Sequence, residues 1–398
     1  MQLLDCKASV VAAAINSGVP SRVKRSGLNT LCVHAAHSPD AAVGSIAEPI
    51  YLSTTFERDA DGAYPRGYRY SREGTPNRTA LESCVAALEG GAGAVAFASG
   101  LAANMAVLDL LGAGDRLVAP LEAYYGSVKQ FSEVARHRGA VLELVDFRDP
   151  PAVKAALSGG ARLLWIETPT NPLLNITDLK LAAAMGHDAG ALVVCDNTFA
   201  TPACQRPFEF GVDLVVHSAT KYLGGHSDVL SGVVAVHEDQ ALLERLRAWQ
   251  RMAGAPLAPF DSWLLRRSIA TLGLRVRAQC QGALKVAEFL AAHPAVERVF
   301  YPGLASHPGH ALAAAQMHGG FGAVLSACIA GGAEAAMQTA SRTRLFTRAT
   351  SLGGVESLIE HRASIEGPGS RAPQNLLRLS VGIEEPEDLK EDLAQALA

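Results

Sequence analysis

The stretch VDLVVHSATK, residues 212–221, is the most informative part of the sequence for the fold. Its apolar first half predicts a buried β-strand, and its second half ends in hydroxyls and a lysine. A lysine directly after a buried strand lies at the carboxyl edge of the sheet, where open α/β folds bind ligands. A desolvated lysine can lose its proton and attack a carbonyl to form a Schiff base. Taken alone, the stretch fits a surface lysine equally well.

The chain around this stretch alternates short apolar runs with helical patterns. Strands are predicted at 94–98, 116–119, 141–145, 162–166, 191–195 and 212–216, and helices at 101–111, 128–138, 152–157 and 179–189. The strands are continuous apolar runs, which is typical of a parallel sheet covered on both faces. The sequence therefore predicts an α/β fold with a mainly parallel sheet flanked by helices.

Two prolines at Pro256 and Pro259 interrupt this rhythm and predict a linker. A helical stretch follows over 262–293, and mixed strands and helices follow Pro302. We predict three parts: an N-terminal extension and arm (1–70), a large α/β domain (71–258) and a smaller C-terminal α+β domain (259–398). Residues 1–25 read as an extension outside the main fold, with a transit peptide as a weakly supported alternative.

Composition excludes several classes of function. The chain has 398 residues, 49% of them hydrophobic, a formal net charge of −4 and no long basic run, so neither disorder nor nucleic-acid binding is expected. Seven cysteines without CxxC spacing predict reduced thiols in a cytoplasm. The pair His34 and His37 lacks further ligands, so no metal site is predicted. No apolar run approaches the ~20 residues of a membrane span.

Asp196 ends the apolar run 191–195 and precedes Lys221 by one strand of the predicted sheet. Both side chains should therefore lie at the same edge. Pyridoxal phosphate needs a carboxylate at its ring nitrogen, because a protonated ring draws electrons from the substrate. An Asp that caps the next turn is the ordinary alternative. Asp and Lys at successive strand ends are a more specific signal than either residue alone.

A phosphate cradle is predicted at Ser99-Gly100-Leu101, which follows a strand and opens a helix. Backbone N–H groups at a helix N-terminus bind phosphate, and the glycine allows close approach. Ser218 and Thr220 add hydroxyls beside Lys221. The pattern GAGAVA at 91–96 precedes a strand, so it is not a dinucleotide fingerprint, and motifs of nucleotide hydrolases, zincins and serine hydrolases are absent.

Together these residues resemble the Cys/Met-metabolism family of pyridoxal-phosphate enzymes, which includes cystathionine γ-synthases, γ-lyases and β-lyases. The resemblance runs from about His34 to the C-terminus. Its matching pieces are PIYLSTTF (49–56), ETPTNP (167–172), DLVVHSATKYLGGHSD (213–228), SLGGVES (351–357) and LRLSVG (377–382). The resemblance implies the fold of type I PLP-dependent transferases, like that of aspartate aminotransferase.

The resemblance also implies roles for the matching cofactor-side residues. Lys221 would carry pyridoxal 5′-phosphate and move protons, Asp196 would pair with the pyridine nitrogen, and Tyr124 would stack on the ring and assist catalysis. The cofactor would further be held by Asn171 and, through its phosphate, by Ser99, Gly100, Leu101, Ser218 and Thr220.

On the substrate side, the resemblance implies that Arg378 clamps the α-carboxylate of an amino acid, with Ser351, Asn171 and Tyr124 assisting. A bidentate guanidinium suits that task. The pair Tyr70 and Arg72 would reach the phosphate of a neighbouring subunit. The chain is therefore expected to form a homo-oligomer, a tetramer built from two dimers that share their active sites, with no nucleic-acid or membrane partner.

Three departures from the family pattern bear on the reaction. The usual Gly-Asn-Pro-Thr reads Gly74-Thr75-Pro76-Asn77, the cysteine that marks methionine γ-lyases is Gly126, and a glutamate frequent in γ-enzymes is Thr350. We predict formation or cleavage of the C–S bond of cystathionine. A β-lyase, a broad C–S lyase, an acylhomoserine sulfhydrylase and, more distantly, an aminotransferase or a non-catalytic binding protein remain alternatives.

Overall fold

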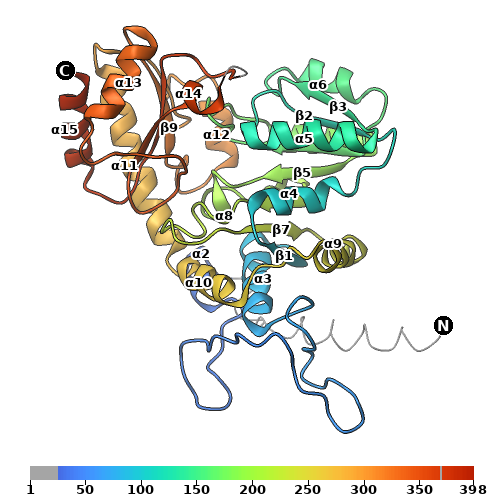
Figure 1. Ribbon diagram of the computed structural model, residues 1–398. Helices are drawn as coiled ribbons and strands as arrows, with labels where there is room; N and C mark the ends of the chain where they lie inside the picture. Colours follow the sequence, from blue (N-terminus) through green and yellow to red (C-terminus); the bar gives the residue numbers. More distant parts are fainter. Residues whose placement is uncertain (1–25, 368–369) are drawn as a thin grey trace.

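The structure, a computed structural model, describes residues 26–367 and 370–398 (Figure 1). The predicted extension over residues 1–25 lies outside the described residues. Two sheets organise the rest of the chain, a larger one near the middle of the sequence and a smaller one toward the C-terminus. The large helix α11 (Leu272–Ala292) runs beside the smaller sheet.

The larger sheet has seven strands in the order β1-β7-β6-β5-β4-β2-β3. They are β1 (Gly93–Phe97), β2 (Arg116–Pro120), β3 (Val141–Val145), β4 (Leu163–Glu167), β5 (Leu192–Asp196), β6 (Leu214–His217) and β7 (Gly232–Val236). Strands β2 to β6 pair in parallel, whereas β7 is antiparallel to both β1 and β6. The predicted α/β class with a mainly parallel sheet is confirmed.

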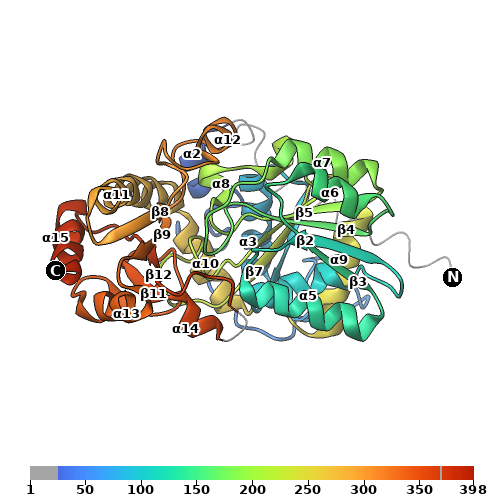
Figure 2. The same ribbon diagram turned by 90° about the horizontal axis from the view of Figure 1, so that it is seen from above.

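Helices cover both faces of this sheet (Figure 2). They are α3 (Pro76–Glu89), α4 (Gly100–Leu108), α5 (Tyr125–Arg138), α6 (Pro150–Leu157), α7 (Leu179–Asp188), α8 (Thr201–Cys204) and α9 (Gln240–Ala253), with a short 3-10 helix at Pro207–Phe210. Successive strand residues enter opposite cores: Val193 and Cys195 belong to the same buried cluster as Leu81 of α3, while Val194 belongs to the other cluster, with Val107 of α4. Both faces are therefore buried, as the continuous apolar runs predicted.

The smaller sheet has five strands in the order β10-β11-β12-β9-β8. They are β8 (Val296–Phe300), β9 (Val324–Ile329), β10 (Thr347–Arg348), β11 (Leu358–His361) and β12 (Leu376–Ser380). The remaining helices are α2 (Leu28–His34), α10 (Pro259–Ile269), α12 (His310–Gln316), α13 (Gly332–Arg342), α14 (Arg362–Glu366) and α15 (Pro386–Leu397). In this sheet β12 is central and antiparallel to both of its neighbours.

Residues 35–75, here called the arm, extend away from both sheets as loops (Figure 1). The arm exposes large apolar side chains: Val43 is 80% exposed, Ile46 71% and Leu52 68%. Exposed apolar residues gathered on one extended segment are typical of a surface that contacts another protein.

Two sequence predictions need correction, and strand β7 was not predicted at all. The helical stretch expected over 262–293 is divided into two helices, α10 and α11, and at the break Ser268 O also accepts hydrogen bonds from the side chains of Arg275 (3.0 Å) and Thr271 (3.2 Å). The expected linker is packed on the sheet, since Leu257 N donates to Ala96 O (3.2 Å).

Candidate active site

Lys221 follows β6 at the carboxyl edge of the larger sheet, as predicted. Its Nζ donates a hydrogen bond to Ser351 Oγ across 2.8 Å. Burial and the Arg378 charge lower the pKa of Lys221 from its ordinary value of 10.5 to about 8. Ser351 itself has φ of +92°, a strained backbone conformation for a residue other than glycine. Lys221 therefore loses its proton at a lower pH than an exposed lysine does.

Two carboxyl groups end neighbouring strands at the same edge. Asp196 ends β5 and Glu167 ends β4, and the two residues are paired in the strand register. Asp196 Oδ1 accepts a hydrogen bond from Thr198 N at 3.0 Å. Burial raises the pKa of Asp196, and burial together with the Asp196 charge raises the pKa of Glu167 well above its usual range. A cation placed beside Asp196 would therefore stabilise the charged form of this carboxyl group.

The sequence reasoning overlooked a role for Glu167, which is only 4% exposed. Its two oxygens accept the backbone N–H groups of Tyr124 (2.8 Å) and Asn171 (2.9 Å). Glu167 therefore ties together two segments that carry predicted site residues. The signal was present, because Glu167 ends an apolar run in the same way as Asp196.

The predicted phosphate cradle opens α4. Ser99 caps this helix, accepting from Ala102 N at 3.1 Å. A Cβ added to Gly100 would lie 3.0 Å from Ser218 Oγ, so the glycine lets the helix end and β6 approach each other closely. Thr220 behaves differently, since its hydroxyl donates to Ser231 O (3.1 Å) and accepts from Ser231 N (3.0 Å). The Thr220 hydroxyl already donates and accepts within the protein. The Ser218 hydroxyl is therefore the better candidate donor to a phosphate.

Tyr124 precedes α5 and its side chain is 42% exposed. Its ring lies against Gly126, where an added Cβ would come within 2.6 Å of Cε1. The predicted stacking residue is therefore an accessible aromatic side chain whose pose requires the absence of a side chain two residues later. Leu101, also exposed at 43%, lies in the first turn of α4.

Arg378 lies in the centre of β12 and is only 3% exposed. Its Nη1 donates to Asn171 Oδ1 (3.3 Å), and its Nη2 donates to Ser351 O (2.8 Å) and to Glu360 Oε2 (2.8 Å). Burial lowers its pKa to about 10. Ser351 thus joins Arg378 to Lys221, and the structure brings these predicted site residues together with Asn171.

Tyr70 and Arg72 lie apart from this group, on the arm. The Arg72 guanidinium stacks on the Tyr70 ring at 5.1 Å, and Arg72 O accepts a hydrogen bond from Arg78 (3.3 Å). None of the contacts described for these two residues reaches Lys221, Asp196 or another predicted site residue. Within one chain, the structure does not join this pair to the site.

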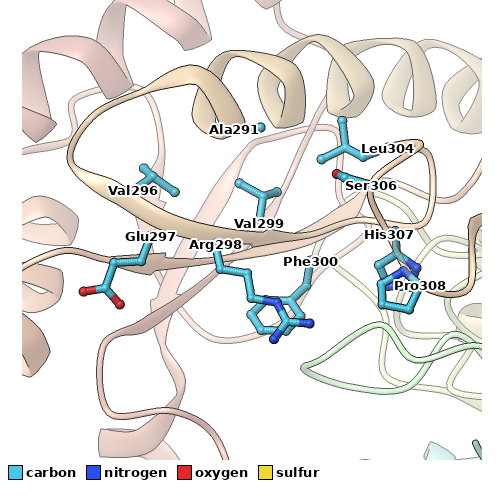
Figure 3. Close-up of a pocket in the computed structure, with 10 residues that line it drawn as sticks. All are labelled: Ala291, Val296, Glu297, Arg298, Val299, Phe300, Leu304, Ser306, His307 and Pro308. Atoms are coloured by element: carbon cyan, nitrogen blue, oxygen red, sulfur yellow. The ribbon is translucent and has the colours of Figure 1, made fainter.

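A separate cavity of about 280 Å³ lies beside α11 in the C-terminal part of the chain. Figure 3 shows it between β8 and the 304–308 loop, with the Arg298 guanidinium over the Phe300 ring (4.5 Å). It contains none of the predicted site residues.

In the described ranges 26–367 and 370–398, no group of three or more His, Cys, Asp or Glu side chains is arranged to hold a metal ion. The same part of the chain contains no helix long and apolar enough to span a membrane. Its six cysteines are all free.

Comparison with known proteins identifies the family. The model of the Cys/Met metabolism PLP-dependent enzymes matches residues 29–398. The chain is 47% identical over 378 residues to a cystathionine γ-synthase of Mycobacterium tuberculosis, with 94% of this chain and 97% of the relative covered. It is 43% identical over 383 residues to a cystathionine β-lyase of Coxiella burnetii, with 94% and 98% covered.

A solved structure agrees with these relatives. A cystathionine γ-synthase of Xanthomonas oryzae pv. oryzae in complex with cystathionine has a TM-score of 0.90 and 43% identity, with 94% of this chain and 98% of that chain covered. The likeness extends over both sheets, since it spans nearly the whole chain. The chain belongs to the Cys/Met metabolism PLP-dependent enzymes, the family that its sequence predicted.

Proposed function

We propose that this enzyme binds pyridoxal 5′-phosphate on Lys221 and forms or cleaves the C–S bond of cystathionine. The observation that carries the proposal is the contact between the Lys221 amine and Ser351, whose carbonyl in turn accepts from Arg378. It links a lysine whose pKa is lowered to about 8 with a buried guanidinium that suits an amino-acid carboxylate. The relatives that match most of the chain are named as cystathionine synthases and lyases.

The residues present fit the cofactor at three points. The carboxylate of Asp196 suits a protonated ring nitrogen, and the Lys221 amine suits the aldehyde. The helix end at Gly100 and Leu101, with Ser218 and Ser99 beside it, suits a phosphate, because the glycine leaves room for close approach. When bound, the cofactor supplies an electron-withdrawing ring that stabilises negative charge at the substrate Cα.

The chain's own residues would supply positioning and proton transfer. Lys221, once free as a neutral amine, would remove the Cα proton, and Ser351 would hold its Nζ near the substrate. Arg378, with Asn171, would bind the α-carboxylate and so orient the Cα–H bond. Tyr124 would cover the ring and assist proton transfer, with Glu167 fixing its backbone.

We propose that the arm completes the site of a neighbouring subunit. Tyr70 and Arg72 have no described contact with the site of their own chain, yet the guanidinium and the phenol suit a phosphate. The exposed apolar side chains of the arm fit a subunit interface. The working unit would then be a tetramer of active-site-sharing dimers. Reduced cysteines fit a cytoplasmic location.

Three reactions within the family are distinguished by their products. A γ-synthase forms cystathionine from an acylated homoserine and cysteine and releases the acyl group as a free carboxylic acid, and a γ-lyase cleaves cystathionine with water to cysteine, 2-oxobutanoate and ammonia. The β-lyase alternative is kept by Thr350 and by the Coxiella relative, and it would give homocysteine and pyruvate. Specificity depends on the substrate-side pocket, because the early steps are common to all members.

The test is incubation of the purified holoenzyme with cystathionine, and separately with an acylated homoserine plus cysteine, followed by mass analysis of products. We expect one of these mixtures to turn over and the protein to absorb visible light. A wild-type protein that stays colourless after incubation with pyridoxal phosphate would overturn the proposal. Amino transfer to a 2-oxo acid without C–S chemistry would replace it with an aminotransferase.

A further inference from the structure

On the C-terminal sheet, the carboxylate of Glu360 is buried beside Arg378. Glu360 of β11 is directly opposite Arg378 of β12 in the strand register, and β11 and β12 lie side by side with α14 close by (Figure 2). One oxygen, Oε2, accepts from both Arg378 Nη2 (2.8 Å) and Arg362 Nη1 (2.5 Å). The other oxygen, Oε1, is buried without a hydrogen-bond partner among the described residues.

The charges continue beyond Arg362. Its Nη2 donates to Glu366 Oε1 (2.7 Å), and Glu366 Oε2 accepts from Ser370 Oγ (2.7 Å). The side chains of all four ionic residues are no more than 6% exposed. The four ionic side chains contact one another in the order Glu366, Arg362, Glu360, Arg378, so acidic and basic groups alternate. The series ends at Arg378, which faces the proposed site.

Three of the five N–H donors of Arg378 have described partners. Nη2 carries two N–H bonds, and Ser351 O and Glu360 Oε2 occupy both; Nη1 donates one of its two to Asn171. A carboxylate that binds with both oxygens takes one N–H from Nη2, whether the second comes from Nη1 or from Nε. An incoming bidentate carboxylate must therefore take an Nη2 donor from Ser351 or Glu360, and of these two only Glu360 is charged.

We infer that Glu360 is a positioning residue that competes with the substrate's α-carboxylate for Arg378, and that Arg362 limits this competition by sharing the same Glu360 oxygen. The inference rests on the proposed role of Arg378 in binding that carboxylate. Glu360 aims the guanidinium while the site is empty. Arg362 draws part of the Glu360 charge away, so that Arg378 keeps its attraction for an anion.

Electrostatics favour this division of roles. In a buried site with few screening waters, a carboxylate facing one guanidinium neutralises it more completely than one shared between two. Removing Arg362 leaves the whole Glu360 charge to Arg378 and should weaken carboxylate binding. Removing the Glu360 charge should strengthen it. A purely structural role for this cluster would weaken binding in both cases.

A matched pair of probes isolates the carboxylate. L-Norleucine contains no sulfur and therefore has no leaving group for C–S chemistry. Pentylamine is the same molecule without its carboxylate. Spectral titration of the holoenzyme with each gives two dissociation constants, and their ratio is the carboxylate preference. The readout is binding of a probe that undergoes no C–S chemistry, so turnover does not enter it.

Glu360→Gln keeps the shape, since its amide oxygen can accept from both guanidiniums while its NH₂ takes the place of the unpartnered oxygen. We expect the carboxylate preference to rise about three- to tenfold in E360Q and to fall by a similar factor in R362M. In the double variant E360Q/R362M the Arg362 substitution should have no further effect. A fall or no change in E360Q, or a rise or no change in R362M, would overturn the inference.

R362M leaves Glu366 buried without its cation and could fail to fold. R362M/E366Q removes the pair as a neutral unit and carries the same expectation, and it also excludes a simple loss of positive charge. The exposed Arg371 serves as the control, since R371M should leave the preference unchanged. A wild-type enzyme without any preference for norleucine contradicts the proposed role of Arg378 itself, whereas a wild-type preference that E360Q and R362M do not alter contradicts only the role of Glu360.

Discussion

The proposed site is assembled from two halves that are built differently, a cofactor half and a substrate half, named for the roles proposed above. The cofactor half uses the carboxyl ends of adjacent parallel strands, β4, β5 and β6, which bring Glu167, Asp196 and Lys221 to one edge. The substrate half uses the face of an antiparallel sheet, where cross-strand register places Glu360 beside Arg378. Hydrogen bonds from Lys221 to Ser351 and from Arg378 to Asn171 join them.

The halves also differ in how their charges are balanced. On the cofactor half, two carboxyl groups lie side by side and the pKa of each is raised, so this half is prepared for a cation. On the substrate half, acids and bases alternate, and Arg378 is already paired. Under the proposed roles, the first half would hold the cofactor and the second would exchange its ion-pair partner when the substrate carboxylate binds.

The largest effect is expected from Lys221→Ala, which removes the attachment point of the cofactor half. We expect loss of the visible band and a fall in kcat of at least ~10³-fold, because a nucleophile and a proton carrier disappear together. The exposed Lys154 of α6 gives the control variant K154A, whose spectrum and activity should match the wild type. A K221A protein that keeps its visible band would disprove the assignment.

On the substrate half, Arg378→Lys should separate substrate binding from cofactor binding. Lysine keeps a positive charge but loses the planar fork, so kcat/KM for cystathionine should fall about 10²-fold while the visible band persists. Steady-state kinetics and an absorption spectrum of the same preparation provide the two readouts. R371K, at an exposed arginine, should change neither. Loss of the band in R378K would mean that the halves are not separable.

The same difference determines what could be read from the sequence. Lys221 and Asp196 were predictable because strands of a parallel sheet end at one edge, and each residue directly follows an apolar run. Glu167 obeys that rule and was overlooked. Glu360 was beyond reach, since antiparallel register between β11 and β12 depends on loops whose length alone does not determine pairing.

Strained backbone was likewise unreadable. Ser351 was expected to assist Arg378 through the family resemblance, but its φ of +92° and its contact with Lys221 came only from the structure. The pair Tyr70 and Arg72 was predicted to serve a neighbouring subunit, and that role remains a prediction.

The pKa of Lys221 on the cofactor half depends on the charge of Arg378 on the substrate half. The neutral amine is the reactive form. As the pH rises toward 8, the rate of pyridoxal phosphate uptake by the apoprotein should therefore increase about tenfold per pH unit, and above pH 8 it should level off. Because Arg378 lowers this pKa, R378Q should move the midpoint upward. Stopped-flow absorbance measures both midpoints. A midpoint near 10.5 in the wild type would contradict the buried, Arg-facing environment.

The same pKa has a consequence for stability. Between about pH 8 and 10.5, the unfolded chain binds more protons at this lysine than the folded apoprotein does. The free energy of unfolding of the apoprotein should therefore rise with pH in that window through Lys221, and K221M should remove this slope. Chemical denaturation at several pH values measures it.

The smallest effect concerns how closely the cofactor half is fitted. In Gly126→Ala the new Cβ would lie 2.6 Å from Tyr124 Cε1, so the ring must move. Tyr124 is 42% exposed and can rotate away, which limits the change in the free energy of unfolding to within about 0.5 kcal/mol. Catalysis should suffer more, with kcat/KM falling several-fold, because a displaced ring covers the cofactor less well.

Gly112→Ala is the matched control for this variant. The nearest atom to its added Cβ is Asp115 Oδ2 at 3.5 Å, an ordinary contact, so neither stability nor kcat/KM should change. Unaltered kcat/KM in G126A would show that the pose of the Tyr124 ring has no bearing on catalysis. The cofactor half would then depend on the strand-end residues alone, and the contrast with the substrate half would sharpen, since only the latter would rely on finely positioned side-chain contacts.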